Sequence, residues 1–288
     1  MVNLALSIIS FSAMMLIFKL IEKYKADTFQ AIVFNYITAA ILGYTIMGTE
    51  LSIAQVTHAV WFPNAIIVGL SFISLFYVIG LTAQKVGISV SAVATKMSLV
   101  IPVTFAFFLY QDTVTAFKVL GILLALLGVL LATKKDEKVI KEKKYFILPI
   151  ILFIGSGLLD TFVNYTEKFY LPDPAASLYF IPTVFTVSAF AGAGVLGASL
   201  IARPSLFSSK SVFWGIILGF FNYGALFFIL QALKLSDLES SVIFSINNIG
   251  IVVLSTIAAR IFFKEHLSRL NITGISISII AILLIAFS

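Results

Sequence analysis

Residues 109–115 read Leu-Tyr-Gln-Asp-Thr-Val-Thr, and residues 262–268 read Phe-Phe-Lys-Glu-His-Leu-Ser. Each segment leads into a long apolar run, and the two runs resemble each other. The residues that align at a constant offset of 153 are Asp112 with Glu265, Thr115 with Ser268, and Gly121 with Gly274. An internal repeat in an apolar chain is typical of membrane transporters, whose binding site lies where the two repeats meet.

The composition places most of the chain in lipid. Of its 288 residues, 60% are hydrophobic and 11% are charged, and the mean hydropathy is +1.10. Soluble domains carry about 25% charged residues, so this mixture cannot supply a water-soluble surface. Spans of a membrane β-barrel are about ten residues of alternating polarity, and no such pattern occurs. We therefore predict an all-α polytopic membrane bundle.

A helix needs about 20 apolar residues to cross the hydrocarbon core, and ten stretches meet this length. They cover residues 2–21, 28–48, 59–83, 88–110, 116–133, 145–166, 174–202, 211–234, 239–263 and 269–287. A Lys-rich linker, 134–144, separates a first five-helix repeat, 1–133, from a second, 145–288. Because each half holds an odd number of spans, the halves are predicted to be inverted repeats. We interpret the first stretch as a retained helix and not a signal peptide.

The distribution of basic residues predicts the orientation. With the N-terminus outside, thirteen Lys and Arg residues of the connecting segments lie inside and three lie outside. The inside set is Lys23, Lys25, Lys85, Lys134, Lys135, Lys138, Lys141, Lys143, Lys144, Arg203, Lys210, Lys264 and Arg269; the outside set is Lys118, Lys168 and Lys234. The positive-inside rule thus favours both termini outside. The net charge of +6 is a topology signal and does not indicate nucleic-acid binding.

Several function classes have no support in the sequence. There is no cysteine and there are two histidines, so no disulfide, thiolate nucleophile or Cys/His metal triad is expected. No nucleotide-binding loop is present, which argues against transport driven by an ATPase of its own. We predict no cofactor and no enzymatic activity.

Paired motifs in the two halves carry a family resemblance. They are Ser91-Ala92, Pro102, Asp112 and the run Gly-Ile-Leu-Leu-Ala-Leu-Leu-Gly-Val of residues 121–129 in the first half, and Ser240-Ser241, Glu265, Leu267 and Gly274 in the second. The ten-helix chain with these motifs resembles the EamA-like branch of the drug/metabolite transporter superfamily. The resemblance implies a central cavity lined by helices one, three, four, six, eight and nine. It also implies both termini in the cytoplasm, opposite to the lysine count.

The chain departs from this family at two places. The second half has no proline at the position of Pro102, where Val252 to Ser255 stand. Small exporters of the superfamily use a carboxylate in helix one, whereas helix one here has Ser10 and Ser12 and no acid. That coupling chemistry is therefore not expected.

Two ionisable residues lie well inside predicted spans, where burial of a charge costs several kcal/mol. Lys96 in the fourth span is interpreted as a cation for an anionic substrate group, with snorkelling or a structural ion pair as the alternative. Asp160 in the sixth span has three candidate roles: pairing with Lys96, carrying a coupling proton, or binding a substrate cation. Lys19 and Arg260 lie near span ends and are expected to snorkel to the interface.

Amides and aromatic residues complete the predicted substrate site. Asn247 and Asn248 lie in the ninth span near the depth of Lys96, with interhelical hydrogen bonding as the alternative. Asn164 follows Asp160 by one helical turn, on the same face. The predicted walls are Tyr77, Asn222 and Tyr223. Small residues, Gly121, Ala125 and Gly128 with Gly274, Ser278 and Ala281, are expected to allow close helix packing, within a monomer or in a homodimer.

These features together predict a secondary transporter of a small organic metabolite in the cell membrane, an exporter or exchanger that works by alternating access. Lys96 favours an anionic or zwitterionic substrate such as an amino acid. A proton or a counter-substrate is the candidate for coupling. The alternatives are a flippase of a lipid or lipid-linked sugar, and, more remotely, an integral membrane enzyme, which would need two close intramembrane acids or a divalent metal.

Overall fold

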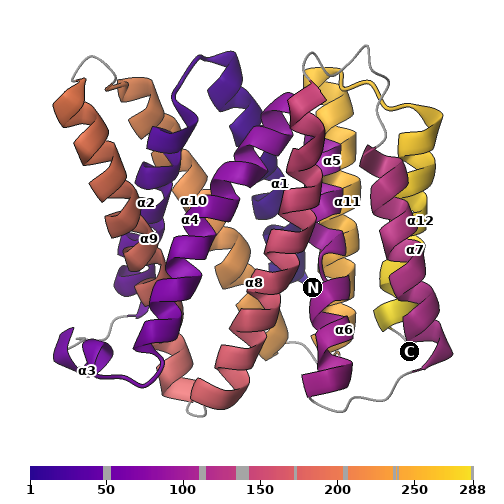
Figure 1. Cartoon of the computed structure of the whole chain (residues 1–288), viewed down its shortest axis with the longest axis horizontal. Helices are drawn as coiled ribbons and strands as arrows, with labels where there is room; N and C mark the ends of the chain where they lie inside the picture. Colours follow the sequence, from indigo (N-terminus) through magenta and orange to yellow (C-terminus); the bar gives the residue numbers. More distant parts are fainter. Residues whose placement is uncertain are drawn as a thin grey trace. The chain divides into compact units, whose positions relative to one another are not determined.

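The computed structural model describes residues 1–47, 53–109, 115–133, 143–171, 174–203, 207–235, 238 and 240–286. Within these residues the regular structure is entirely helical (Figure 1). The helices are α1 (Val2–Lys23), α2 (Thr28–Met47), α3 (Ile53–Thr57), α4 (Phe62–Lys85), α5 (Ile88–Met97), α6 (Val100–Leu109), α7 (Ala116–Thr133), the 3₁₀ helix η1 (Lys143–Ile147), α8 (Leu148–Tyr170), α9 (Pro174–Ala202), α10 (Ser209–Leu235), α11 (Ser240–Phe263) and α12 (Arg269–Ala286). The predicted all-α class is confirmed.

Nine helical segments in the described part of the chain are long and apolar enough to cross a membrane. The shorter apolar helix Ala116–Ala132 corresponds to the predicted span 116–133. The chain is therefore a polytopic helical membrane protein. The count of ten spans and the inversion of the two halves remain predictions.

The predicted span 88–110 is not one continuous helix. Helix α5 ends at Met97, the next helical residue is Val100, and α6 continues to Leu109. Pro102 explains the break, because it has no N–H to donate to the carbonyl of Ser98 and its ring crowds that carbonyl. The Ser98 carbonyl instead accepts the N–H of Ile101 at 2.9 Å. Lys96 consequently lies in the last turn of a ten-residue helix.

Short elements that the sequence did not predict join some spans. Helix α3 occupies residues that were assigned to a connecting segment and to no span. The 3₁₀ helix η1 leads directly into α8, which begins at Leu148, and the candidate span that includes both begins at Tyr145, as predicted. Both elements are five residues long, too short to register as hydrophobic runs.

The contacts divide the chain into two compact units. Unit 1 consists of Met1–Lys19, Val78–Leu158 and Gly224–Ser288, and unit 2 consists of Leu20–Tyr77 and Leu159–Tyr223. Each unit draws on both halves of the sequence, and helices α1, α4, α8 and α10 contribute residues to both. The division into repeats along the sequence is a different partition and remains a prediction.

In unit 1, helices α7 and α12 lie side by side (Figure 1). A Cβ added at Gly274 would lie 2.3 Å from the Ala132 nitrogen, and one added at Gly128 would lie 3.1 Å from the Gly274 oxygen. The small residues therefore let the two backbones come into contact within one chain. The aligned residues Thr115 and Ser268 also share a role, since their hydroxyls accept N–H groups of the first turns of α7 and α12 at 3.1 and 3.2 Å.

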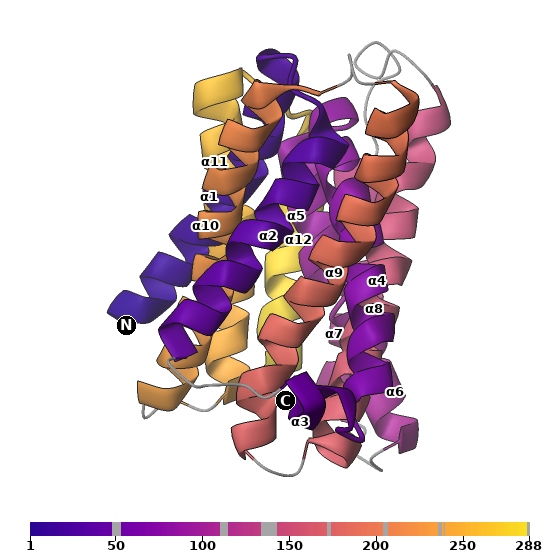
Figure 2. The same cartoon turned by 90° about the vertical axis from the view of Figure 1, so that its left-hand side faces the viewer.

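In unit 2, helices α2 and α9 lie side by side (Figure 2). The first part of α10 also packs closely on α2. A Cβ at Gly215 would lie 2.6 Å from the Ala31 oxygen, and one at Gly219 would lie 2.7 Å from the Asn35 oxygen. This spacing of two glycines by four residues places both on one face of α10.

Candidate functional site

The predicted substrate-binding residues fall into both units. Lys96, Asn247 and Asn248 belong to unit 1. Tyr77, Asp160, Asn164, Asn222 and Tyr223 belong to unit 2. We therefore describe the contacts of these side chains separately for each unit.

Lys96 is half-buried, and its ammonium lies over an aromatic ring. The Nζ atom is 3.9 Å from the centroid of the Phe11 ring in α1. The face of an aromatic ring attracts a cation, by about 0.5–2 kcal/mol depending on desolvation. The ring therefore lowers the cost of keeping this charge inside the bundle and fixes the position of the ammonium.

Charged side chains of opposite sign lie at the two ends of α5, one of them from the segment after α11. The N-terminus of α5 follows Gly87, whose φ of 143° is open to glycine and strained for other residues. The Ile88 N–H donates to the Glu265 carboxylate at 3.1 Å. Lys96 lies in the last turn, where carbonyl groups lack partners within the helix. An acid at the N-terminus and a base at the C-terminus both interact favourably with the helix dipole.

The Asn pair lies on α11, which packs against α5. Val93 and Met97 of α5 share a core cluster with Val252 of α11. Asn247 is 6% exposed, and its Oδ1 has no hydrogen-bond partner among the described residues. A buried amide oxygen without a partner costs about 1–3 kcal/mol. Helix α11 thus holds an acceptor that interhelical bonding within the described chain does not satisfy.

Helix α1 contacts the other helices of this region through serines. Ser12 and Ser255 are both buried, and their hydroxyl oxygens are 3.2 Å apart. Ser7 donates to the Ala225 carbonyl of α10 at 2.9 Å. At the offset of 153, Ser255 aligns with Pro102, so the second half has a hydrogen-bonding side chain where the first half has a helix break.

Three contributors to this region were not predicted as site residues: Phe11, Ser255 and Glu265. Phe11 is one of 28 phenylalanines, and nothing local distinguishes it. The repeat did point to Glu265, which aligns with Asp112, but its contact with Ile88 spans 177 residues. Asp112 itself lies outside the described residues.

Lys19 does not simply extend to the interface. Its ammonium donates to the backbone carbonyl of Gln84, and the Gln84 amide donates to the Phe18 carbonyl at 2.9 Å. Gln84 is in the last turn of α4, so this cation caps a helix C-terminus. The contact joins α1 to α4.

In unit 2, Asp160 and Asn164 are both exposed, one turn apart on α8. Tyr77 is 37% exposed and lies edge-on to Phe29 of α2, with ring centroids 6.1 Å apart. These side chains present polar atoms at the surface of their unit.

The two wall residues of α10 are half-buried. A Cβ added at Gly43 of α2 would lie 3.5 Å from the Tyr223 ring and 3.2 Å from Pro182 of α9. The Tyr223 ring therefore packs beside the α2–α9 contact. Asn222 precedes it in the same helix.

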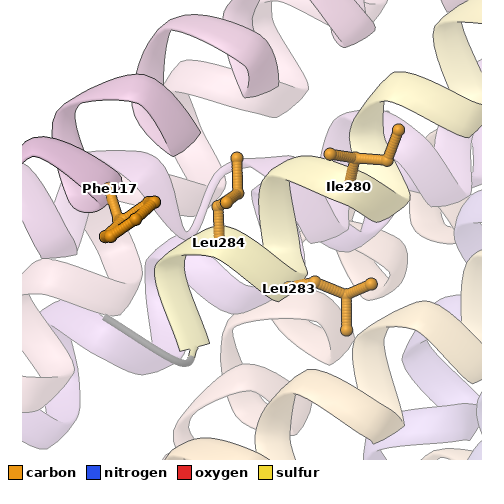
Figure 3. A pocket seen from close by; sticks show the side chains of 4 residues that line it. All are labelled: Phe117, Ile280, Leu283 and Leu284. Atoms are coloured by element: carbon orange, nitrogen blue, oxygen red, sulfur yellow. The ribbon is translucent and has the colours of Figure 1, made fainter.

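An apolar hollow of about 330 Å³ lies on α7 and α12 (Figure 3). Phe117, Ile280, Leu283 and Leu284 line it. None of these four side chains is polar, so we do not assign the hollow to the candidate site. Among the described residues, no three His, Asp or Glu side chains gather as metal ligands.

No family model matches the chain. An "Uncharacterized protein" of Haemophilus influenzae (strain ATCC 51907 / DSM 11121 / KW20 / Rd) is 29% identical over 289 residues. The alignment covers 97% of this chain and 96% of the relative. The similarity thus extends through both predicted halves, in a protein of nearly the same length.

Proposed function

We propose that the chain is a secondary transporter of a small zwitterionic or anionic metabolite, such as an amino acid, in the cell membrane. The observation that carries the proposal is the position of Lys96, a half-buried cation in the last turn of a broken helix. Discontinuous helices are typical of the ion and substrate sites of secondary transporters. The paired sequence motifs support membership of the EamA-like transporters.

Two groups of unit 1 match the two ends of a zwitterion. The Lys96 ammonium is suited to a carboxylate, because a charged hydrogen bond in a low-dielectric site is strong. The Asn247 Oδ1, which has no partner among the described residues, is suited to accept from a substrate ammonium. Alternating exposure of this site to the two sides of the membrane would move the substrate, by export or exchange.

The test is flux into proteoliposomes preloaded with unlabelled metabolite, with labelled amino acids, organic acids and nucleobases supplied outside. We expect exchange of at least one anionic or zwitterionic compound. Lys96→Ala should raise its apparent KM at least tenfold, since a charged hydrogen bond contributes about 1.5–3 kcal/mol. The matched control is Lys168→Ala, which alters an exposed lysine at the end of α8. An unchanged KM in Lys96→Ala for every transported anion would refute the proposal.

A pH jump in the same vesicles tests coupling. If Asp160 carries a proton, an inward proton gradient changes the rate in the unsubstituted protein and not in Asp160→Asn. Exchange that is independent of pH in both proteins assigns coupling to the counter-substrate. Movement of a fluorescent lipid, with no flux of soluble metabolite, would favour a flippase.

A further inference from the structure

A groove of about 500 Å³ in unit 2 is not part of the proposed transport site. It is lined by Tyr24, Ser209, Lys210, Phe213 and Trp214, and we call it the aromatic–basic groove. The Tyr24 and Trp214 rings are stacked, with centroids 5.4 Å apart and an interplanar angle of 23°. The Phe213 ring lies edge-on to Trp214 at 5.4 Å. Three rings at one place form a continuous apolar wall.

The groove lies at helix ends, not in the middle of a span. Helix α1 ends at Lys23, and Lys25 has a left-handed φ of 55° that turns the chain. The Ala26 N–H closes this turn by donating to the Ile21 carbonyl at 3.0 Å. Because α1 is a candidate span, Tyr24 is at the level of the membrane surface.

Hydrogen bonds hold the start of α10 at this same level. The Asp27 N–H donates to the Ser211 hydroxyl at 2.8 Å, and the Ser208 N–H donates to the Gln30 side chain at 3.1 Å. These two bonds join the start of α10 to residues 27 and 30, just after the turn that follows Tyr24. Aromatic side chains at such a position lie among lipid head groups.

Three features give the groove a preference for negative charge. Lys210 lines it, and exposed Lys23 and Lys25 flank Tyr24 in the chain. The first turn of α10, at Ser209, presents the positive end of a helix dipole. The carboxylate of Asp27, at the start of α2, accepts the Gln30 N–H at 2.8 Å.

We propose that the aromatic–basic groove binds the head group of an anionic phospholipid. Lys210 and Lys23 would bind the phosphate, and the Trp214 and Phe213 rings would pack against the glycerol and the first methylenes of the acyl chains. The lysine count places this end of the bundle in the cytoplasmic leaflet, where anionic lipids attract clustered lysines. This inference is independent of the proposed transport.

The chain supplies its own probe, because it contains two tryptophans. In Trp61→Phe, Trp214 is the only tryptophan, and brominated lipids quench its fluorescence on contact. We would compare brominated phosphatidylglycerol with brominated phosphatidylcholine in vesicles with the full-length protein. Phosphatidylglycerol should associate about 25-fold more tightly, and Lys23→Gln with Lys210→Gln should abolish this preference, since each of the two lysines near an anionic surface contributes about a fivefold gain.

The control is Lys234→Gln, which alters a lysine in the last turn of α10, at the other end of the same helix. It should keep the preference, and 1 M salt should remove it. If Trp61→Phe does not fold, the difference in quenching between the unsubstituted protein and Trp214→Phe gives the same measurement. Equal quenching by both lipids would overturn the proposal, as it would show an ordinary aromatic belt. Quenching by neither would also overturn it, since a protein partner would then cover the groove.

Discussion

The ammonium nitrogen of Lys96 lies 3.9 Å from the centroid of the Phe11 ring. This contact joins α5 to α1 and places a positive charge beside the break between α5 and α6. An aromatic face attracts a cation without neutralising it, unlike a carboxylate. The Phe11 ring therefore helps to position the ammonium of Lys96.

Phe11→Leu should weaken transport while leaving the protein folded. Loss of the ring face removes about 1–2 kcal/mol at a partly desolvated site, or about five- to thirtyfold in apparent KM. Phe11→Tyr keeps the ring and should retain most activity. The measurement is exchange in proteoliposomes over a range of substrate concentrations. A Leu variant as active as the Tyr variant would show that the ring does not position Lys96.

The variant Asn247→Leu distinguishes a substrate-binding role of Asn247 from a role in holding helices together. If the buried Oδ1 awaits a substrate group, its removal should raise the midpoint of thermal unfolding in detergent, because an unsatisfied buried acceptor costs about 1–3 kcal/mol. The same variant should lose most exchange activity. The two effects have opposite signs. A variant that is both less stable and less active would instead indicate that Asn247 holds helices together.

Glu265→Ala should destabilise unit 1 by about 1–2 kcal/mol, because α5 loses its N-terminal acceptor and a favourable charge. The stability of Glu265→Gln should fall between those of Glu265→Ala and the unsubstituted protein, since Gln keeps an acceptor oxygen and loses the charge. Thermal unfolding followed by helical circular dichroism measures both. The control, Glu167→Ala, removes an exposed acid from the last turn of α8 and should be neutral or slightly stabilising. Equal midpoints for all four proteins would contradict the capping role.

Gly274→Ala should destabilise the α7–α12 contact by at least about 2 kcal/mol, because its Cβ would lie 2.3 Å from backbone nitrogen of Ala132. A Cβ at Gly194 would meet nothing within 4 Å, so Gly194→Ala should be neutral or stabilising. Chemical denaturation in mixed micelles compares the two. If both variants behave alike, the close approach of α7 and α12 does not limit stability.

The lysine count predicts that both termini lie outside. Hydrogen bonds connect segments assigned to the same side: Ile88 with Glu265 in unit 1, and Asp27 with Ser211 in unit 2. These bonds fit either orientation, so the expectation rests on the lysine count. If the C-terminus lies outside, a C-terminal alkaline phosphatase fusion should be active and a C-terminal green fluorescent protein fusion dark. The reverse pattern would favour the orientation implied by the family resemblance.

Part of the candidate site could be predicted from the sequence, because it consists of single polar residues within long apolar runs. Lys96 and Asn247 stand out since a polar group inside a long hydrophobic run is costly wherever the helix packs. Pro102 was identified as a motif residue, but its consequence, the end of α5 five residues before it, was not predicted. A hydropathy pattern registers apolar length and does not register a missing N–H.

The sequence by itself determined the helical membrane class, the approximate span positions and the close packing of small residues, because these follow from local hydrophobicity and side-chain size. Only the tertiary structure decided which groups meet. Phe11 and Lys96 are 85 residues apart in the chain, and Ile88 and Glu265 are 177 apart. Such pairs depend on helix order and rotation, which in lipid are set by packing and polar contacts between helices, and no local pattern encodes them.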